Sequence, residues 1–232
     1  MSLLEMPTTL PPTPAVVPPL ESGDVLSREE FLRRGEAMGG VRAERIGGVV
    51  VMPASISAKD HGHPLSQIQT LLGIYHAHTP GTKTSSPATT HMGPDDDPEP
   101  DVMRYVKEDH GGRVRVTGEG YLEGPPELIV EVANTSAAAD LVTKRDLYER
   151  EGVSEYIVWL YSRRRAVGHR HGDGGYDRVE TVPVYQSVVF PGLWIDFEAL
   201  HREDLLAAMN TLQEGLATED HAAFVKGLAE AK

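Results

Sequence analysis

The chain has 232 residues, a formal net charge of -13 and no cysteine. This length suffices for one well-buried core with appendages, so we look for a single functional site. Disulfides and thiolate metal ligands are excluded, and any metal must be held by oxygen or imidazole. No run approaches the about 20 apolar residues of a membrane span, and the start of the chain lacks the charged and apolar regions of a signal peptide. We therefore expect a cytoplasmic protein with no membrane partner.

The acidic balance argues against tight, nonspecific binding of nucleic acid, because proteins that bind this polyanion usually carry a basic balance. Basic residues nevertheless gather in the middle of the chain: Arg113, Arg115, Lys144, Arg145, Arg150, Arg163, Arg164, Arg165 and Arg170. They could form a basic face on an acidic protein. The commoner alternative is that they are the solvated faces of a helix and a hairpin.

The N-terminal 24 residues contain the pairs Pro11-Pro12 and Pro18-Pro19 and no apolar periodicity. This composition predicts an extended, disordered arm outside the fold. The folded domain is then expected over residues 25–200. Ser27 and Glu30 form a capping box, which predicts a helix that runs through about Met38.

A hairpin, a helix and two strands are predicted next. The pair Gly47-Gly48 favours a two-residue β-hairpin, whose first strand carries Glu44. Pro64 stands where a helix can begin, and apolar residues then recur at helical spacing: Leu65, Ile68, Leu71, Leu72 and Tyr75. We expect this helix to pack against a sheet. A strand near residues 82–90 and an acidic turn lead to a short apolar strand that Asp101 opens.

The second half of the chain alternates buried strands with helices. The segment ELIVEVA is a continuous apolar run typical of a central strand, and its one interior charge is Glu131. Residues 136–152 predict a helix with Ser136 as a cap and Gly152 as the stop. Further strands are expected in EYIVWLY, RAVGHRH and YDRVETV. Helical stretches from about 203 to 231 suggest a C-terminal helical extension over residues 201–232.

The buried strand points to the chemistry. A carboxylate at Glu131 must be paired, hydrogen-bonded or bound to a metal, because isolated burial costs several kcal/mol. On the following helix Leu141, Lys144 and Tyr148 share one stripe, which should face the sheet. Lys144 is therefore the natural partner of Glu131.

Asp101 and Glu44 complete an acidic cluster. Carboxylates and a backbone carbonyl, here that of Val132, suit a hard cation such as Mg2+ or Mn2+, which can activate a water against a phosphodiester. A nearby lysine would position the nucleophile and offset charge on the phosphate. Asp101, Glu131, Lys144 and Glu44 are thus the candidate catalytic residues.

Several anchors resemble a known family. In chain order they are ERIGG, Pro100-Asp101, Glu131 within LIVEVANTS, Asp140, Lys144, Tyr148, GVSEYIVWL and FPGLWIDF. Together they are similar to the Uma-two family of restriction endonucleases, within the PD-(D/E)XK nuclease superfamily, from roughly Ser27 to Phe197. The resemblance implies a restriction-endonuclease-like α/β fold with a mixed β-sheet flanked by helices. It also implies a metal at Asp101 and Glu131 and DNA as the substrate.

The chain departs from the superfamily pattern at three positions. The orthodox lysine stands two residues after the second acid, where this chain has Ala133; the resemblance assigns that role to Lys144 from the next helix. Leu160 and Glu127 stand where relatives carry aspartate. Neither change touches the proposed metal ligands, but both leave the substrate contacts open.

Each candidate also has a structural interpretation. Asp101 could be a turn residue, Glu131 and Lys144 a buried salt bridge, and Glu44 a solvent-facing hairpin residue. The acid Asp140 could form a helix pair with Lys144, and Tyr148 is typical of a core. The histidine pairs His61/His63, His76/His78 and His169/His171 lack an evident third ligand for zinc, and Trp159 and Trp194 are more typical of a core than of a stacking platform.

Two functions follow from these observations. The first is an Mg2+-dependent endonuclease that acts on DNA, expected as a homodimer because two-fold association is common and would suit cleavage of two strands. The second is a noncatalytic nucleic-acid-binding or protein-interaction module on the same fold, since a fold does not establish chemistry.

Overall fold

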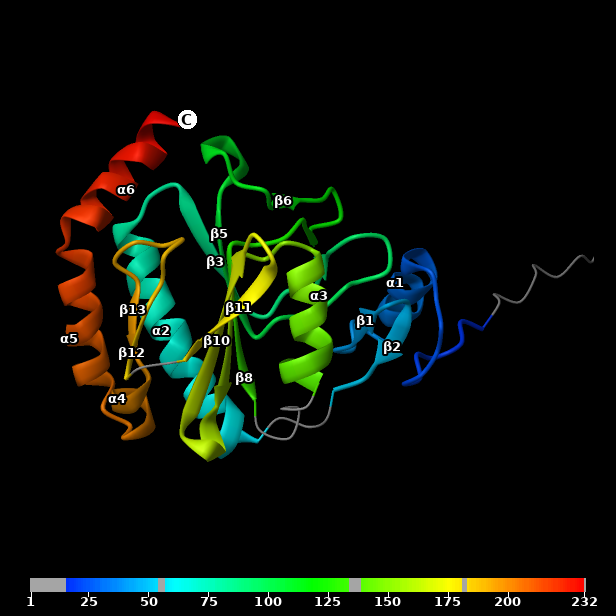
Figure 1. The fold of residues 1–232 in the computed structure, drawn as a ribbon. Helices are drawn as coiled ribbons and strands as arrows, with labels where there is room; N and C mark the ends of the chain where they lie inside the picture. The colour runs from blue at the N-terminus through cyan, green and yellow to red at the C-terminus, as the bar shows by residue number, and fades with distance from the viewer. Residues whose placement is uncertain (1–15, 54–56, 134–138, 181–182, 232) are drawn as a thin grey trace, which may run out of the picture.

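A six-stranded mixed sheet forms the centre of the computed structural model, which describes residues 16–53, 57–133, 139–180 and 183–231 (Figure 1). In the order β11-β10-β9-β8-β5-β3, its strands are β11 (Gly175–Glu180), β10 (Arg165–Gly172), β9 (Glu155–Leu160), β8 (Leu128–Ala133), β5 (Val102–Val106) and β3 (Thr82–Ser85). The central pair β8–β9 is parallel and its neighbours are antiparallel. The mixed α/β sheet expected from the sequence is therefore confirmed.

The two central strands are buried along their whole length, as a parallel pair covered on both faces should be. Side chains alternate between the two faces. Val130 and Val132 pack on the face of the sheet that α2 (His63–His78) covers, whereas Ile129 and Glu131 lie on the other face.

Helices cover both faces of this sheet (Figure 1). Pro64 lies in the first turn of α2, as predicted, and α2 packs its apolar residues on one face. On the other face a π-helical segment, η3 (Ala139–Lys144), continues into α3 (Arg145–Arg150). The helix predicted over residues 136–152 is therefore present from Ala139 to Arg150, with a π-helical first part, and the proposed Ser136 cap lies outside the described residues. Gly152 follows the helix with a positive φ, as its stop role requires.

A small lobe precedes the sheet and contains α1 (Arg28–Ala37), β1 (Glu44–Ile46) and β2 (Val49–Val51). The Ser27 side chain accepts a hydrogen bond from the Glu30 N–H, which confirms the predicted cap. Gly47 and Gly48 both have positive φ and close the predicted hairpin.

The predicted arm is too long at its C-terminal end. Leu20 is buried against Phe31 and Val50, and the Gly23 N–H donates to the Val50 carbonyl. Ordered structure therefore begins before residue 25. One apolar residue docking on a helix and a hairpin leaves no periodicity for the sequence to display.

The C-terminal part adds a hairpin and three helices: β12 (Val184–Gln186), β13 (Trp194–Asp196), α4 (Phe197–His201), α5 (Leu205–Leu216) and α6 (Glu219–Glu230). Ala208 and Leu212 of α5 are fully buried in the same core as α2. The segment treated as an extension after residue 200 is therefore part of the main core.

The remaining elements are short. The predicted strand near residues 82–90 is two strands, because β4 (Thr90–His91) joins β7 (Leu122–Glu123) and β6 (Arg115–Val116) in a separate sheet. Single turns of helix occur at η1 (Ala58–Gly62), η2 (Glu108–His110) and η4 (Tyr161–Arg163).

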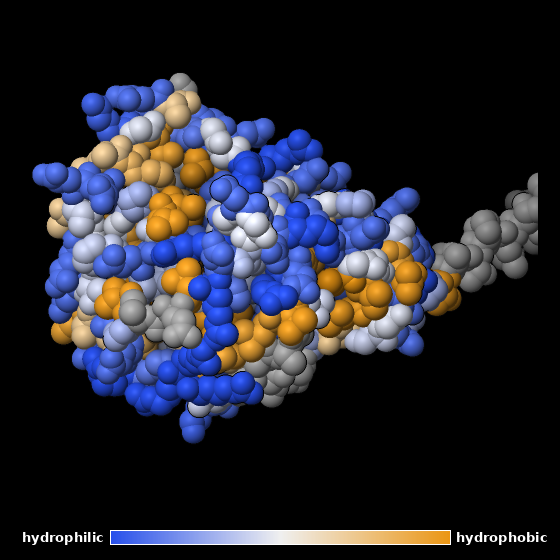
Figure 2. All heavy atoms as spheres, in the orientation of Figure 1, coloured by the Kyte–Doolittle hydropathy of each residue, from blue (hydrophilic) through white to orange (hydrophobic). Residues whose placement is uncertain are grey.

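The surface is predominantly hydrophilic on the face in Figure 2, and apolar residues gather over the α1–β1–β2 lobe. The exposed large apolar side chains of that lobe include Val25, Val49 and Val51. Within the described residues, no helix has the length and apolar composition to cross a membrane.

Candidate active site

Two carboxylates meet at the junction of β5 and β8. Val102 pairs with Val130 in antiparallel register, which places Asp101 opposite Glu131. The Asp101 N–H lies 3.3 Å from Glu131 Oε2 and donates to it. In the other direction the Val132 N–H donates to Asp101 Oδ2 at 2.9 Å. Both carboxyl groups are buried, so the predicted meeting of the two acids is confirmed.

Lys144 lies among three of the cluster's carboxylates. Its Nζ is 2.9 Å from Glu131 Oε1 and 2.9 Å from Glu44 Oε1, and it is 3.8 Å from Asp140 Oδ1. The predicted partnership of Lys144 and Glu131 is confirmed. The helix pair of Asp140 and Lys144 is also present, at the longer distance.

Glu44 is not the solvent-facing hairpin residue of the simpler interpretation. It is 8% exposed, and the Oε1 atom that meets Lys144 also accepts the Glu99 N–H at 2.8 Å. The β1–β2 hairpin therefore delivers a carboxylate to the centre from outside the main sheet.

The centre carries an excess of negative charge. Burial raises the pKa of Glu131 well above its ordinary value; Lys144 opposes this shift, while neighbouring carboxylates reinforce it. Burial alone would lower the pKa of Lys144, but Glu131, Glu44 and Asp140 outweigh it and raise that pKa. Lys144 is therefore a firmly held cation. The Tyr148 hydroxyl donates to Glu131 Oε1 at 3.2 Å, so this core tyrosine also contacts the centre.

His61 is a member of the centre that the sequence did not identify. Its Nδ1 lies 2.8 Å from the Val132 carbonyl, which can only accept, and its Nε2 lies 3.3 Å from Asp101 Oδ1. Burial would raise the pKa of Asp101, but His61 outweighs this effect and holds the pKa below its usual range. The contact with Asp101 likewise raises the pKa of His61. The sequence offered only a His-Gly-His run before a helix, a spacing that lacks a third ligand for zinc and carries no signal for an orienting imidazole.

Arg42 is a second unpredicted member. Its guanidinium lies 3.4 Å from Asp101 Oδ1 and 3.3 Å from Glu99 Oε1. Burial would lower the pKa of Arg42, yet these carboxylates raise it. An arginine in a loop before a short strand carries no sequence signal for such a role.

The donor chemistry of Asp101 and Glu131 fits a hard divalent cation. Among the described residues, no three His, Asp or Glu side chains converge as a metal-binding group. Two carboxylates nevertheless suffice for Mg2+, which is commonly held by one or two carboxylates and keeps several waters. The acids around Glu131 outnumber Lys144, and a divalent cation would offset that excess. The Val132 carbonyl already contacts His61, which leaves its second lone pair for a ligand.

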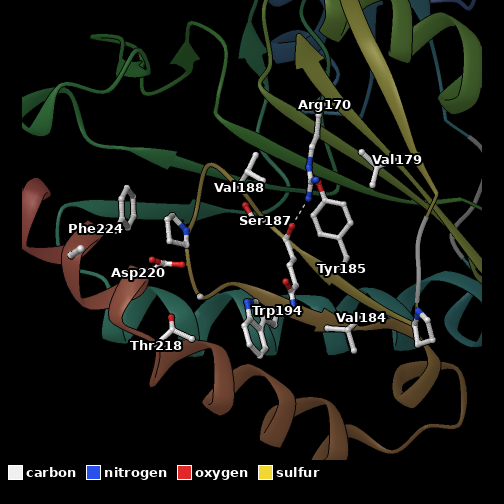
Figure 3. Close-up of a pocket in the computed structure, with 15 residues that line it drawn as sticks. Arg170, Val179, Val184, Tyr185, Ser187, Val188, Trp194, Thr218, Asp220 and Phe224 are labelled. Carbon is white, nitrogen blue, oxygen red and sulfur yellow. Dashed lines mark hydrogen bonds between the residues drawn. The ribbon is translucent and has the colours of Figure 1, made fainter.

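A cavity of about 1050 Å³ lies away from the acidic centre, between the β12–β13 hairpin and α6 (Figure 3). Its wall includes Trp194 and Phe224 but no residue of the acidic centre. Trp159 is fully buried as predicted, whereas Trp194 is only partly buried and borders this cavity. Arg170 in the same wall is engaged by Glu155, at 3.1 Å.

The fold and the sequence have known counterparts. One solved structure, described as a "putative nuclease belonging to DUF820" from Anabaena variabilis, superposes with a TM-score of 0.55 at 14% identity, over 79% of this chain and 99% of that one. At this identity the likeness concerns the fold. A comparison with curated proteins found no match. The family model described as "Putative restriction endonuclease" matches residues 28–198, which include every acidic residue of the centre and Lys144. The chain therefore belongs to the Uma2 (Uma-two) family.

Proposed function

We propose that this chain is a metal-dependent endonuclease that hydrolyses phosphodiester bonds of DNA, with Mg2+ or Mn2+ at Asp101 and Glu131. The observation that carries the proposal is the convergence of two buried carboxylates from adjacent strands, with the Lys144 ammonium 2.9 Å from Glu131. The description of the family and of its solved structural relative supports the same class of reaction.

Each residue of the centre has a separate role in this proposal. A divalent cation bound there would polarise the phosphate and lower the pKa of a bound water. Asp101 and Glu131 hold the cation, and His61 and Arg42 orient Asp101. The raised pKa of Lys144 suits a hydrogen-bond donor that offsets negative charge on the phosphate, rather than a base.

Glu44 keeps the Lys144 ammonium in place while Glu131 engages the cation. Its carboxylate is held by the Glu99 N–H and contacts Nζ at the same 2.9 Å as Glu131 does. Glu44 is thus a positioning residue in this proposal, because it acts through Lys144.

The alternative is a noncatalytic binding or interaction module. It is favoured by the self-contained network around Lys144, whose charge is already balanced by carboxylates. Such a network could serve only to stabilise the junction of the hairpin, β8 and η3.

A cleavage assay separates the two functions. Supercoiled and linear DNA are incubated with the protein and Mg2+, Mn2+ or a chelator, beside Asp101→Asn as the matched inactive variant. The proposal expects metal-dependent nicking that the chelator and Asp101→Asn both abolish. Absence of cleavage with either metal, from a folded protein, would support the noncatalytic module.

A further inference from the structure

A second, basic pocket lies on the α3 side of the sheet, near its β10–β11 edge. Alternation along β10 places Arg165 and His169 on this face, and His169 is paired directly with Arg178 of β11. The pocket has a volume of about 440 Å³, and Arg145 and Glu149 of α3 form part of its wall.

The charge of this pocket is opposite to that of the whole chain. Four guanidinium groups line it, from Arg145, Arg163, Arg165 and Arg178, against the single carboxylate of Glu149. Within the described ranges, three of them form no ion pair: Arg163, Arg165 and Arg178. Glu149 is itself engaged, because its Oε1 accepts the Tyr176 N–H at 2.6 Å. In a protein of net charge -13, several unneutralised arginines at one cavity indicate a site for an anion.

His169 supplies an independent sign of a ligand. It is 7% exposed and lines the pocket, yet its Nε2 has no hydrogen-bond partner among the described residues. A buried polar atom left in this state destabilises the fold unless a ligand or water satisfies it. Burial, with Arg145 and Arg178, lowers the pKa of His169, so the ring is neutral near pH 7 and can donate one N–H to an anion.

The pocket and the acidic centre share one helical segment. Lys144 and Arg145 are consecutive residues, of which Lys144 meets Glu131 and Arg145 lines the pocket. Leu141 of η3 also borders it. One helical segment therefore contributes residues to both locations.

We infer that this basic pocket binds a phosphate group of the DNA strand whose scissile phosphate lies at the acidic centre. The inference rests on the proposed function and adds the surface that holds the flanking part of the substrate. Guanidinium groups match phosphate oxygens in paired hydrogen bonds, and His169 lines the same cavity.

The chain provides a matched control beside the pocket. Arg164 follows Arg163 directly but lines a different pocket, with Glu198 and His201. Lys83 is exposed on β3, at the other edge of the sheet. The variants Arg163→Gln/Arg178→Gln and Arg164→Gln/Lys83→Gln therefore remove the same charge, and only the first pair alters the basic pocket.

Binding is measured by fluorescence anisotropy of a labelled DNA duplex over a range of salt concentrations, with chelator present so that no cleavage occurs. The inference predicts that Arg163→Gln/Arg178→Gln weakens binding by about tenfold or more and lowers the slope of log K against log salt by about 1 to 2. The control pair should change the affinity by less than about twofold. Equal effects of both pairs, or no effect of the first, would overturn the inference.

Two further measurements distinguish free phosphate from DNA phosphate as the ligand, and distinguish failure of the pocket from failure of the proposed nuclease. If inorganic phosphate alone binds the pocket more tightly than the duplex does, the site serves a free anion and the inference fails. Duplex binding through Arg163 and Arg178 without Mg2+-dependent cleavage would uphold the pocket and reject the nuclease. Cleavage with unchanged duplex affinity in Arg163→Gln/Arg178→Gln would uphold the nuclease and reject the pocket.

Discussion

At the scale of single residues, the buried charge of Glu131 determines its surroundings. A carboxylate in a fully covered strand requires a cation, and Ala133 at the orthodox lysine position cannot provide one. Lys144 reaches Glu131 from the end of η3 instead. Lys144 could be predicted as the partner of Glu131, because any buried carboxylate needs a compensating group. Glu44 was also placed in the cluster from the sequence, whereas His61 was not, because the η1 turn brings it in from far along the chain.

Replacing Lys144 tests its role. Lys144→Ala should reduce cleavage by about 100-fold or more, as expected for loss of a group that acts on the reacting phosphate. Lys144→Arg should restore little, because guanidinium is larger and has a different geometry. Initial rates on one DNA substrate, with Mg2+ at saturation, give the comparison.

The same variant separates catalysis from stability. Without metal, Lys144→Ala leaves Glu131 without its cation and should lower the free energy of unfolding by about 3–5 kcal/mol. Adding Mn2+ should recover much of the lost thermal stability while cleavage stays low. Recovery of stability together with full cleavage would remove Lys144 from the mechanism.

At the scale of elements, regular patterns were predictable and irregular ones were not. The α2 helix, the Gly47-Gly48 hairpin and the central strands follow from apolar spacing and turn chemistry. Of the side chains described in the π-helical segment η3, the buried ones are the charged Asp140 and Lys144, so no apolar spacing distinguished it from an α-helix. The β12–β13 pair joins two short segments across a long loop, so its register depends on contacts with α5.

Close packing of α5 on this hairpin makes one glycine important. A Cβ added at Gly215 would lie 2.4 Å from the Gly192 carbonyl oxygen and 2.8 Å from Trp194 Cγ. Gly215→Ala should therefore destabilise the protein by about 1–3 kcal/mol, despite the better helix propensity of alanine. Gly227→Ala in α6 is the control: nothing lies within 4 Å of its added Cβ, and it should stabilise by about 0.5–1 kcal/mol. Urea denaturation measures both; a stable Gly215→Ala would contradict this packing.

The contribution of His221, in α6, to the stability of the fold should depend on pH. His221 is buried, with Nε2 3.1 Å from Thr79 Oγ1 and Nδ1 3.0 Å from the Leu216 carbonyl. Burial lowers its pKa below the ordinary 6.5, and His78 and Arg104 contribute in the same direction. The unfolded chain therefore binds the proton first, so this contribution to stability is present above pH 6.5 and is lost as the pH falls below it.

His221→Gln keeps hydrogen-bonding groups but cannot titrate. Its melting temperature should fall less steeply than that of the wild type as the pH decreases from about 7.5 to about 5.5. Thermal unfolding followed by circular dichroism at several pH values gives both curves. Parallel curves would show that His221 does not supply this pH dependence.

At the scale of the whole molecule, an acidic protein must still hold a polyanion if it cleaves DNA. The arginines around the basic pocket concentrate positive charge on one side of the sheet, which overall composition does not reveal. The sequence identified the cluster of basic residues in the middle of the chain. It did not separate Arg163 from Arg164, because only the fold sends the two side chains to different pockets.

We further propose that the protein acts as a homodimer, since cleavage of two strands is most simply achieved by two copies of one site. Light scattering coupled to size exclusion should give a mass of about twice the 25.3 kDa of one chain. A mass of one chain across the concentrations used for cleavage would reject the dimer and leave the site unaffected.

The proposed reaction depends on cation binding at Asp101 and Glu131, which calorimetric titration with Mn2+ measures. The wild type should bind the ion, and Asp101→Asn and Glu131→Gln should each weaken binding by about 100-fold or more, because each removes one charged oxygen ligand. Asp140→Asn is the control, since it alters a buried acid of the same cluster without touching the proposed ligands. Unchanged Mn2+ binding in both ligand variants would show that Asp101 and Glu131 do not hold the cation.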